Sequence, residues 1–184
     1  MECVSDGDLK VTVTNNDYVE TETIVNSGTF VAGVDTADSL KATTSIENKA
    51  GASFTNGGWL NSPDATFTNS GTLTNTHDMF VGKLVNNSTG IFNNNCTTGW
   101  FAEAGILENK GIINNDSNST LWIDNGFKNT GIINNDYQLV FGNEGVIADM
   151  PNNGVINGNG TTFIYAQMIN DGTITQKNLN KYVK

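Results

Sequence analysis

Asp116 and Asp136 are the acidic residues whose positions come nearest to those of a catalytic pair. Both follow the string Gly-Ile-Ile-Asn-Asn in neighbouring stretches of the chain, so a repetitive fold would stack them. Glycoside hydrolysis needs two carboxylates about 5–10 Å apart, and Trp100 and Trp122 could line a groove beside them. Asn and Asp oxygens also suit calcium, so a weak calcium site near Asp116 and Asp136 is a second possibility. We favour a plain Asn-Asn-Asp turn with exposed carboxylates.

The other reactive side chains are isolated in the sequence. His77 is the only histidine, and one histidine cannot build a multi-histidine zinc site. We expect it to be a surface turn residue. Cys3 and Cys96 lack metal-ligand spacing, and a disulfide between them stays open. Nucleophile-elbow, P-loop and dinucleotide motifs do not occur. The sequence therefore predicts no enzyme and assigns no catalytic, cofactor-binding or metal-binding residue.

The charge balance excludes two classes of partner. The chain has nine Lys, no Arg and nineteen Asp plus Glu, with a net charge of -10. Nucleic-acid binding needs clustered basic residues, and docking on anionic lipid needs them too. No apolar run has membrane-spanning length, and no apolar segment follows Met1 as in a signal peptide. We expect no nucleic-acid partner, no membrane insertion by this segment, and a mature protein or a piece of a longer one.

One short motif organises the chain. It reads apolar, any residue, Asn, any residue, Gly, any residue, apolar, with two copies stretched by two residues, and its Asn advances by 17 to 23 residues. The eight Asn are Asn26, Asn48, Asn69, Asn86, Asn109, Asn129, Asn152 and Asn170. The glycines of the six unstretched copies are Gly28, Gly71, Gly111, Gly131, Gly154 and Gly172. Repeats of this length are stacking units, because one copy alone cannot bury its apolar side.

The repeat predicts an all-β fold, a right-handed parallel β-helix of about eight coils of roughly 20 residues. Residues 24–176 form the coils, 1–23 an N-terminal strand or cap, and 177–184 a C-terminal tail or cap. A sandwich or barrel would not show an eightfold motif. Leucine-rich repeats would show more leucine and a helix. We expect each Gly to supply φ > 0 at a bend and the Asn amides to bond in a column.

The residues after each motif glycine predict an outward, largely apolar column. They include Thr72, Ile91, Ile112, Ile132 and Val155. Apolar triplets elsewhere in the coils place further apolar side chains outside, among them Phe101 and Trp122. Contiguous exposed apolar strips often mark contact surfaces. We therefore expect one face to pack on a protein or glycan ligand or on another copy of the chain.

The copies LENKGIINN and FKNTGIINN resemble the haemagglutinin-type repeats of bacterial filamentous-haemagglutinin-like adhesins and autotransporter passenger domains. The resemblance covers roughly residues 24–176. It implies an extracellular or cell-surface location and a role as the stalk or binding segment of an adhesin or surface fibre. A carbohydrate-active β-helix, such as a phage tailspike or a polysaccharide-degrading domain, is the alternative. An ice-binding solenoid is a third reading, since regular Thr arrays on flat solenoids bind ice, although Ile and Val interrupt this one.

Overall fold

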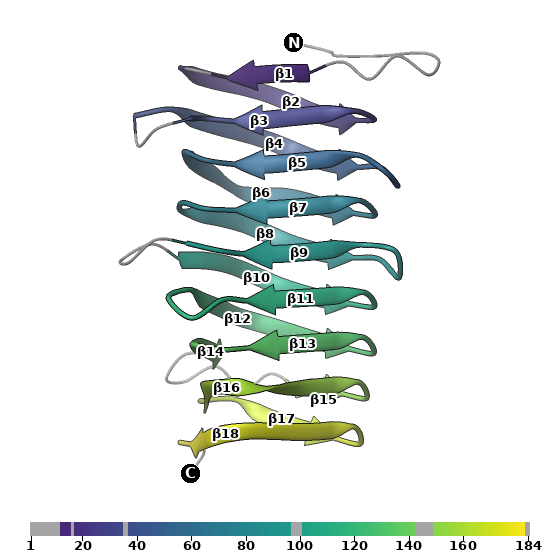
Figure 1. The fold of residues 1–184 in the computed structure, drawn as a ribbon, viewed down its shortest axis with the longest axis vertical. Coiled ribbons are helices and arrows are strands. Elements are labelled where there is room, and N and C mark those ends of the chain that lie inside the picture. The colour runs from purple at the N-terminus through teal and green to yellow at the C-terminus, as the bar shows by residue number, and fades with distance from the viewer. Residues whose placement is uncertain (1–11, 16, 35–36, 97–100, 143–148, 183–184) are drawn as a thin grey trace.

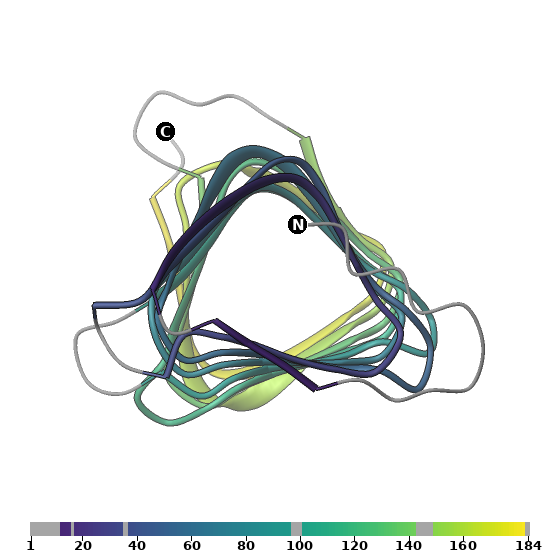
Figure 2. The ribbon, with the colours of Figure 1, turned by 90° about the horizontal axis from the view of Figure 1, so that it is seen from above.

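The chain folds into a single parallel β-solenoid. The computed structural model describes residues 12–15, 17–34, 37–96, 101–142 and 149–182. These residues form an 18-stranded sheet and no helix, and thus no helix that could cross a membrane. About eight coils of roughly 20 residues stack along one axis, and the cross-section is a triangle (Figure 2). The predicted fold class is confirmed.

The three sides of the triangle are named face A, face B and face C. In one coil, face A is formed by Thr120–Ile123, face B by residues 126–129 and face C by Ile132–Asn135. Face C consists of short strands through most of the molecule. These are β1 (Thr12–Asn15), β3 (Thr29–Ala32), β5 (Ser53–Asn56), β7 (Thr72–Asn75), β9 (Ile91–Asn94), β11 (Ile112–Asn115) and β13 (Ile132–Asn135).

Longer strands bend once and cover faces A and B in succession. They are β2 (Tyr18–Asn26), β4 (Ser39–Asn48), β6 (Trp59–Asn69), β8 (Met79–Asn86), β10 (Phe101–Asn109) and β12 (Thr120–Asn129). Near the C-terminus the long strands join faces C and A instead. The last five strands are β14 (Gln138–Phe141) on A, β15 (Asp149–Asn152) on B, β16 (Val155–Ile164) on C and A, β17 (Gln167–Asn170) on B and β18 (Thr173–Lys181) on C and A.

The coil is right-handed. In Figure 1 the strands of face C run to the left in front, and the long strands return to the right behind as the chain descends. The parallel pairing begins with β1 on β3 and ends with β18 on β16, at Lys181. Coiling therefore extends beyond the expected range of 24–176 at both ends, into the segments for which caps were expected.

Inward side chains of the three faces fill the centre of the triangle. Equivalent residues stack coil upon coil, as Phe30 does on Phe54 with ring centroids 4.9 Å apart. Fully buried members of face B include Ile46, Phe67, Leu84, Leu107 and Met150, and those of face C include Phe54, Leu73, Phe92, Ile113, Ile133 and Ile156. Because this packing is repeated from coil to coil, each coil is stabilised mainly by burial of apolar surface against the coils next to it.

The motif glycines have a role other than the one expected. Positive φ occurs among the described residues only at Gly33, Gly51, Gly142 and Gly158, and at no Asn. Gly51, the glycine of one stretched copy, has the expected φ of 78°, but the prediction of left-handed backbone was wrong for the six unstretched copies. A Cβ on Gly131 would instead overlap the carbonyl oxygen of Gly111 in the coil before it. Such glycines permit close stacking at the corner between faces B and C, which we call corner B–C.

Candidate contact surface

The eight motif asparagines form a continuous ladder at corner B–C, which we call ladder 1, and all of them except the exposed Asn170 are buried. The Nδ2 atom of each Asn donates to Oδ1 of the Asn in the next coil, from Asn26 to Asn170, at 2.7–2.9 Å. Most also donate to a main-chain carbonyl of the following coil, as Asn48 does to Thr72 at 3.0 Å. The expected column of Asn amides is present, and it satisfies side chains that would be costly to bury unpaired.

A second ladder, ladder 2, lies at the corner between faces C and A, corner C–A, and was not predicted. It comprises Asn56, Asn75, Asn94, Asn115 and Asn135, joined by Nδ2–Oδ1 bonds of 2.7–3.0 Å. Its signal is in the sequence: the third Asn of LENKGIINN is Asn115, six residues after Asn109. The seven-residue motif ends at Ile113, two positions before this residue.

Ladder 2 is incomplete at both ends. The position above Asn56 is Ala32, and the buried Oδ1 of Asn56 has no hydrogen-bond partner in the described structure. At the other end Gly158 replaces the Asn, and its backbone has a φ of 115°. Gln176, one coil further on, reaches past Gly158 so that its Oε1 accepts from Asn135 Nδ2 at 2.7 Å. The longer side chain of Gln176 thus reaches across the coil in which Gly158 has no amide side chain.

Face C carries no charged side chain at its outward positions. Eight successive strand segments contribute two outward residues each, sixteen in all, in two columns. One column is Thr29, Ser53, Thr72, Ile91, Ile112, Ile132, Val155 and Thr173, and the other is Val31, Thr55, Thr74, Asn93, Asn114, Asn134, Asn157 and Thr175. Faces A and B do carry outward charges, such as Glu103 and Lys83. An uncharged face on a chain of net charge -10 is a distinct surface.

The isoleucines of the first column are among the exposed large apolar side chains. Ile112 and Ile132 have exposed fractions of 37% and 40%, so the outward orientation expected for this column is present. Beside them, Asn134 Nδ2 donates to Asn114 Oδ1 at 2.7 Å, and Asn114 Nδ2 to Asn93 Oδ1 at 2.8 Å. These bonds fix the outer amides in register, so face C presents an ordered surface.

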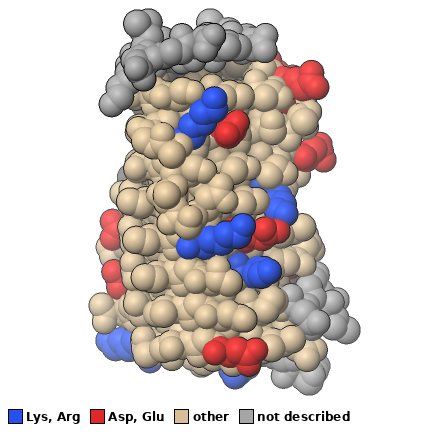
Figure 3. Space-filling view, turned by 90° about the vertical axis from the view of Figure 1, so that its right-hand side faces the viewer, with Lys and Arg blue, Asp and Glu red and all other residues tan. Residues whose placement is uncertain are grey.

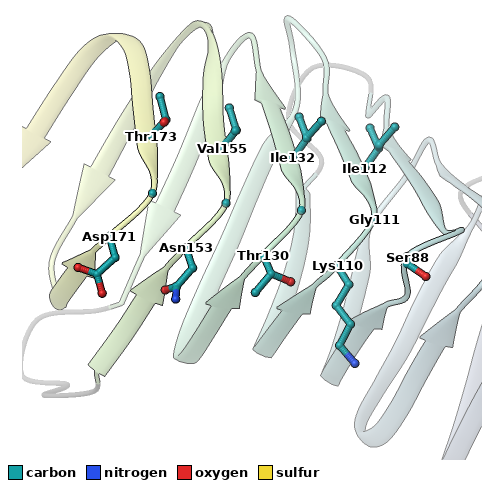
Figure 4. Close-up of a pocket in the computed structure, with 13 residues that line it drawn as sticks. Ser88, Lys110, Gly111, Ile112, Thr130, Ile132, Asn153, Val155, Asp171 and Thr173 are labelled. Atoms are coloured by element: carbon teal, nitrogen blue, oxygen red, sulfur yellow. The ribbon is translucent and has the colours of Figure 1, made fainter.

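A groove of about 680 Å³ runs along corner B–C beside this face. Its floor is formed by the motif glycines, which have no side chains: Gly111, Gly131, Gly154 and Gly172. Ile112, Ile132, Val155 and Thr173 form one wall, and Lys110, Thr130, Asn153 and Asp171 form the other (Figure 4). An elongated partner on face C could therefore extend one edge into the groove, between an apolar and a polar wall.

Phe101 and Trp122 do not lie on this surface. Both are outward residues of face A, where Phe101 pairs with Thr120 and Trp122 with Glu103. Thr72, Ile91, Ile112, Ile132 and Val155 lie together on face C. The expected contact surface is thus two surfaces on different sides of the triangle.

Asp116 and Asp136 occupy neighbouring turns at corner C–A and are exposed. Each carboxylate already accepts a backbone hydrogen bond, Asp116 from Ser117 at 2.7 Å and Asp136 from Asn159 at 3.0 Å. No group of three or more His, Cys, Asp or Glu residues suited to a metal exists in the described part of the chain. Trp100, expected beside them, lies outside the described residues.

His77 and Cys96 meet at the same corner but lack the chemistry of a catalytic pair. His77 is 5% exposed, so the expectation of a surface residue was wrong. Cys96 is a buried free thiol whose Sγ contacts Asn75 Nδ2 at 3.0 Å and Asn94 Oδ1 at 3.1 Å. Burial, helped by the charge of Asp78, raises the pKa of this thiol to about 12, which keeps it protonated and unreactive. Cys3 lies outside the described residues.

Glu103 and Asp124 form a carboxyl pair on face A. Burial, and then the hydrogen bond and charge of Asp124, raise the pKa of Glu103 to about 7. A hydrogen bond between two carboxyl groups favours the protonated form of Glu103. They are closer than the roughly 5–10 Å that glycoside hydrolysis requires between its two carboxylates, so this pair suits binding better than bond cleavage.

Lysines are dispersed among carboxylates. Lys41 pairs with Glu20 at 2.9 Å and Lys83 with Glu108 at 2.6 Å, and the hydrogen bond from Lys83 lowers the pKa of Glu108. Viewed from the right-hand side of Figure 1, the surface is mainly uncharged with scattered lysines beside acidic residues (Figure 3).

Comparison of the chain with family models, curated proteins and solved structures finds no match.

Proposed function

We propose that the chain is a non-enzymatic contact protein whose uncharged face C docks on a partner surface. In this proposal it forms the stalk or binding segment of an extracellular or bacterial cell-surface adhesin or fibre. The observation that carries it is the absence of charge at the sixteen outward positions that the strands from β3 to β18 contribute to face C. Removing an ion from water is costly, so a face without ions is the one most cheaply covered.

Rigidity supports the same role. Two buried Asn ladders and the stacked core fix the face along roughly 35–40 Å, taking about 4.8 Å per coil. Because its side chains are already ordered, as Asn114 and Asn134 are by their hydrogen bonds, binding would cost little conformational entropy. The proposal includes a protein, a glycan or a second copy as partner and excludes nucleic acid.

The alternative of a carbohydrate-active enzyme has less support. Asp116 and Asp136 are exposed turn residues already bonded to the backbone. The Glu103–Asp124 pair is too close for a bond to be cleaved between its members. Release of reducing sugar from a polysaccharide by the purified protein would establish this alternative and remove our proposal.

The ice-binding reading depends on the regularity of Thr on face C. Thr72 and Thr74 form one Thr-x-Thr row and Thr173 and Thr175 another. The four coils between them have Ile or Val in the first column and Asn in the second. The Thr array is thus interrupted in the middle of the face, and we expect no thermal hysteresis.

Attachment of protein-coated beads tests the proposed function. Beads carrying the 184-residue chain are offered epithelial cells, matrix proteins and beads coated with the same chain. We expect firm attachment to at least one of these. The double variant Ile112→Lys and Ile132→Lys should reduce it at least tenfold, because it places two charges in the face.

The matched control is Ile106→Lys. Ile106 is an outward residue of face B with the same exposed fraction as Ile132, 40%, so the control adds a charge without altering face C. Attachment lost equally in the control, unaffected by the double variant, or undetectable on every surface would refute the proposal. Thermal melts confirm that both variants remain folded.

A further inference from the structure

All outward-facing aromatic side chains of the described strands lie on face A or at its ends. Faces B and C have none at their outward positions. At the centre of face A, Trp59 and Phe101 stand two coils apart in one column, with exposed fractions of 51% and 38%. Phe80 and Trp122 stand two coils apart in the next column. Such segregation is not required by the core, which uses inward positions.

Each pair of aromatic residues brackets one carboxyl group. Asp78 lies between Trp59 and Phe101, where its Oδ1 accepts from the Phe101 backbone N–H at 3.1 Å. Glu103 lies between Phe80 and Trp122 in direct strand register. Aromatic rings two coils, or about 9.6 Å, apart match the first and third pyranose rings of a linear oligosaccharide, and carboxyl groups between them can bond ring hydroxyls.

Trp122 supplies a further polar group. Its indole Nε1 is buried without a hydrogen-bond partner in the described structure, although the side chain as a whole is partly exposed. Buried N–H donors are nearly always paired. If the indole ring tilted, a hydroxyl of a ligand could accept a hydrogen bond from Nε1. Ligand binding would then satisfy a donor that is unpaired in the free protein.

We infer that this patch, Trp59, Asp78, Phe80, Phe101, Glu103 and Trp122, binds an uncharged glycan lying along the solenoid axis. The C–H faces of the sugar rings would pack on the aromatic rings, and their hydroxyls would bond the carboxyl groups. An anionic glycan is disfavoured because two acidic side chains lie in the patch of a chain with a net charge of -10. The site is independent of face C and rests on different residues.

A glycan array that carries neutral and acidic oligosaccharides, probed with the 184-residue protein, tests this inference. We expect binding to neutral members such as cello-, xylo-, manno- or chito-oligosaccharides. Titration calorimetry of the best hit should show at least tenfold weaker binding for Trp59→Ala and for Trp122→Ala. Trp59 is half exposed, so its removal leaves the core intact even if the Trp122 variant is less stable.

Ile106→Ala on face B and Ile132→Ala on face C are the matched controls, since they remove side chains of similar exposure. Both should bind within twofold of the unmodified protein. An array without neutral hits, binding to acidic members alone, or tryptophan variants that bind normally would each overturn the inference. The face C lysine variant should retain glycan binding, which separates failure here from failure of the proposed function.

Discussion

Corners B–C and C–A each contain an Asn ladder, yet only the first is visible as a repeat. At corner B–C two residues separate the ladder Asn from the next strand in six of eight copies, as between Asn129 and Ile132. At corner C–A the separation varies from two residues, after Asn56, to six, after Asn94. At corner B–C a Cβ on most motif glycines would overlap the neighbouring coil, although Ala52 occupies this position in one coil, whereas corner C–A accommodates His77, Cys96 or Ser119. An Asn ladder alone therefore does not make a corner uniform in length.

The largest effect should come from adding one methyl group at corner B–C. Gly131→Ala would drive its Cβ into the carbonyl oxygen of Gly111, and rigid backbone cannot move aside. We expect a loss of about 4 kcal/mol or more in the free energy of unfolding, measured by urea denaturation. Ser119→Ala at corner C–A should cost only about 1 kcal/mol.

Gly126→Ala is the control for this comparison, because its Cβ would meet Ile106 at an ordinary 3.5 Å. It should change stability by less than about 1 kcal/mol. If Gly131→Ala proved as mild as Gly126→Ala, steric closeness would not be what distinguishes the two corners.

The two ladders themselves should be equally important. Asn109→Ala in ladder 1 and Asn94→Ala in ladder 2 each remove a buried amide that donates to the next Asn and to a main-chain carbonyl. Each should cost about 2–4 kcal/mol, since the neighbouring amides are left unpaired. Urea denaturation of both variants checks this, and a clearly smaller loss for Asn94→Ala would mean that ladder 2 is dispensable.

Ladder 2 can also be extended. Ala32→Asn places an amide above Asn56, whose Oδ1 is buried and unpaired in the described structure. We expect a gain of about 1–2 kcal/mol, seen as a higher melting temperature. Ala42→Asn, at a buried position of face A outside either ladder, should be destabilising. Destabilisation by both changes would contradict the proposed continuation.

The smallest effect concerns Glu103 on face A, near the third corner, at which the described residues form no Asn ladder. Glu103 has its pKa raised from 4.5 to about 7, so the folded state holds this proton more tightly than the unfolded state. Its contribution is therefore present at low pH and is lost as pH rises from 4.5 through 7. The melting temperature of the unmodified protein relative to Glu103→Gln should be higher at pH 5 than at pH 8. A pH-independent difference would contradict the raised pKa.

The sequence predicts what is spaced regularly and misses what is not. Asn109 and Gly111 predicted the solenoid, its coil length and ladder 1, because their spacing is nearly constant. Asn94 and Asn115 escaped because their distance from the next strand varies. The glycine mechanism was wrong for the unstretched copies because a φ preference is local, whereas the overlap at Gly131 comes from another coil.

The functional surfaces were predicted only in part for a similar reason. Alternation along a strand placed Ile112 and Ile132 outside, but it could not assign Phe101 and Trp122 to another side of the triangle. That assignment depends on where the chain bends, and the bend between faces A and B has no fixed motif. The lack of charge on face C emerges only once all eight coils are in register.

Hydroxyl-radical footprinting of the protein attached to the surface it binds tests the central claim most directly, because it reports which face is covered. We predict that attachment protects Ile91, Ile112, Ile132 and Val155, while Ile106 and Ile169 on face B react as in the free protein. Protection of face B with face C left reactive, or no change on any face, would contradict contact through the uncharged face.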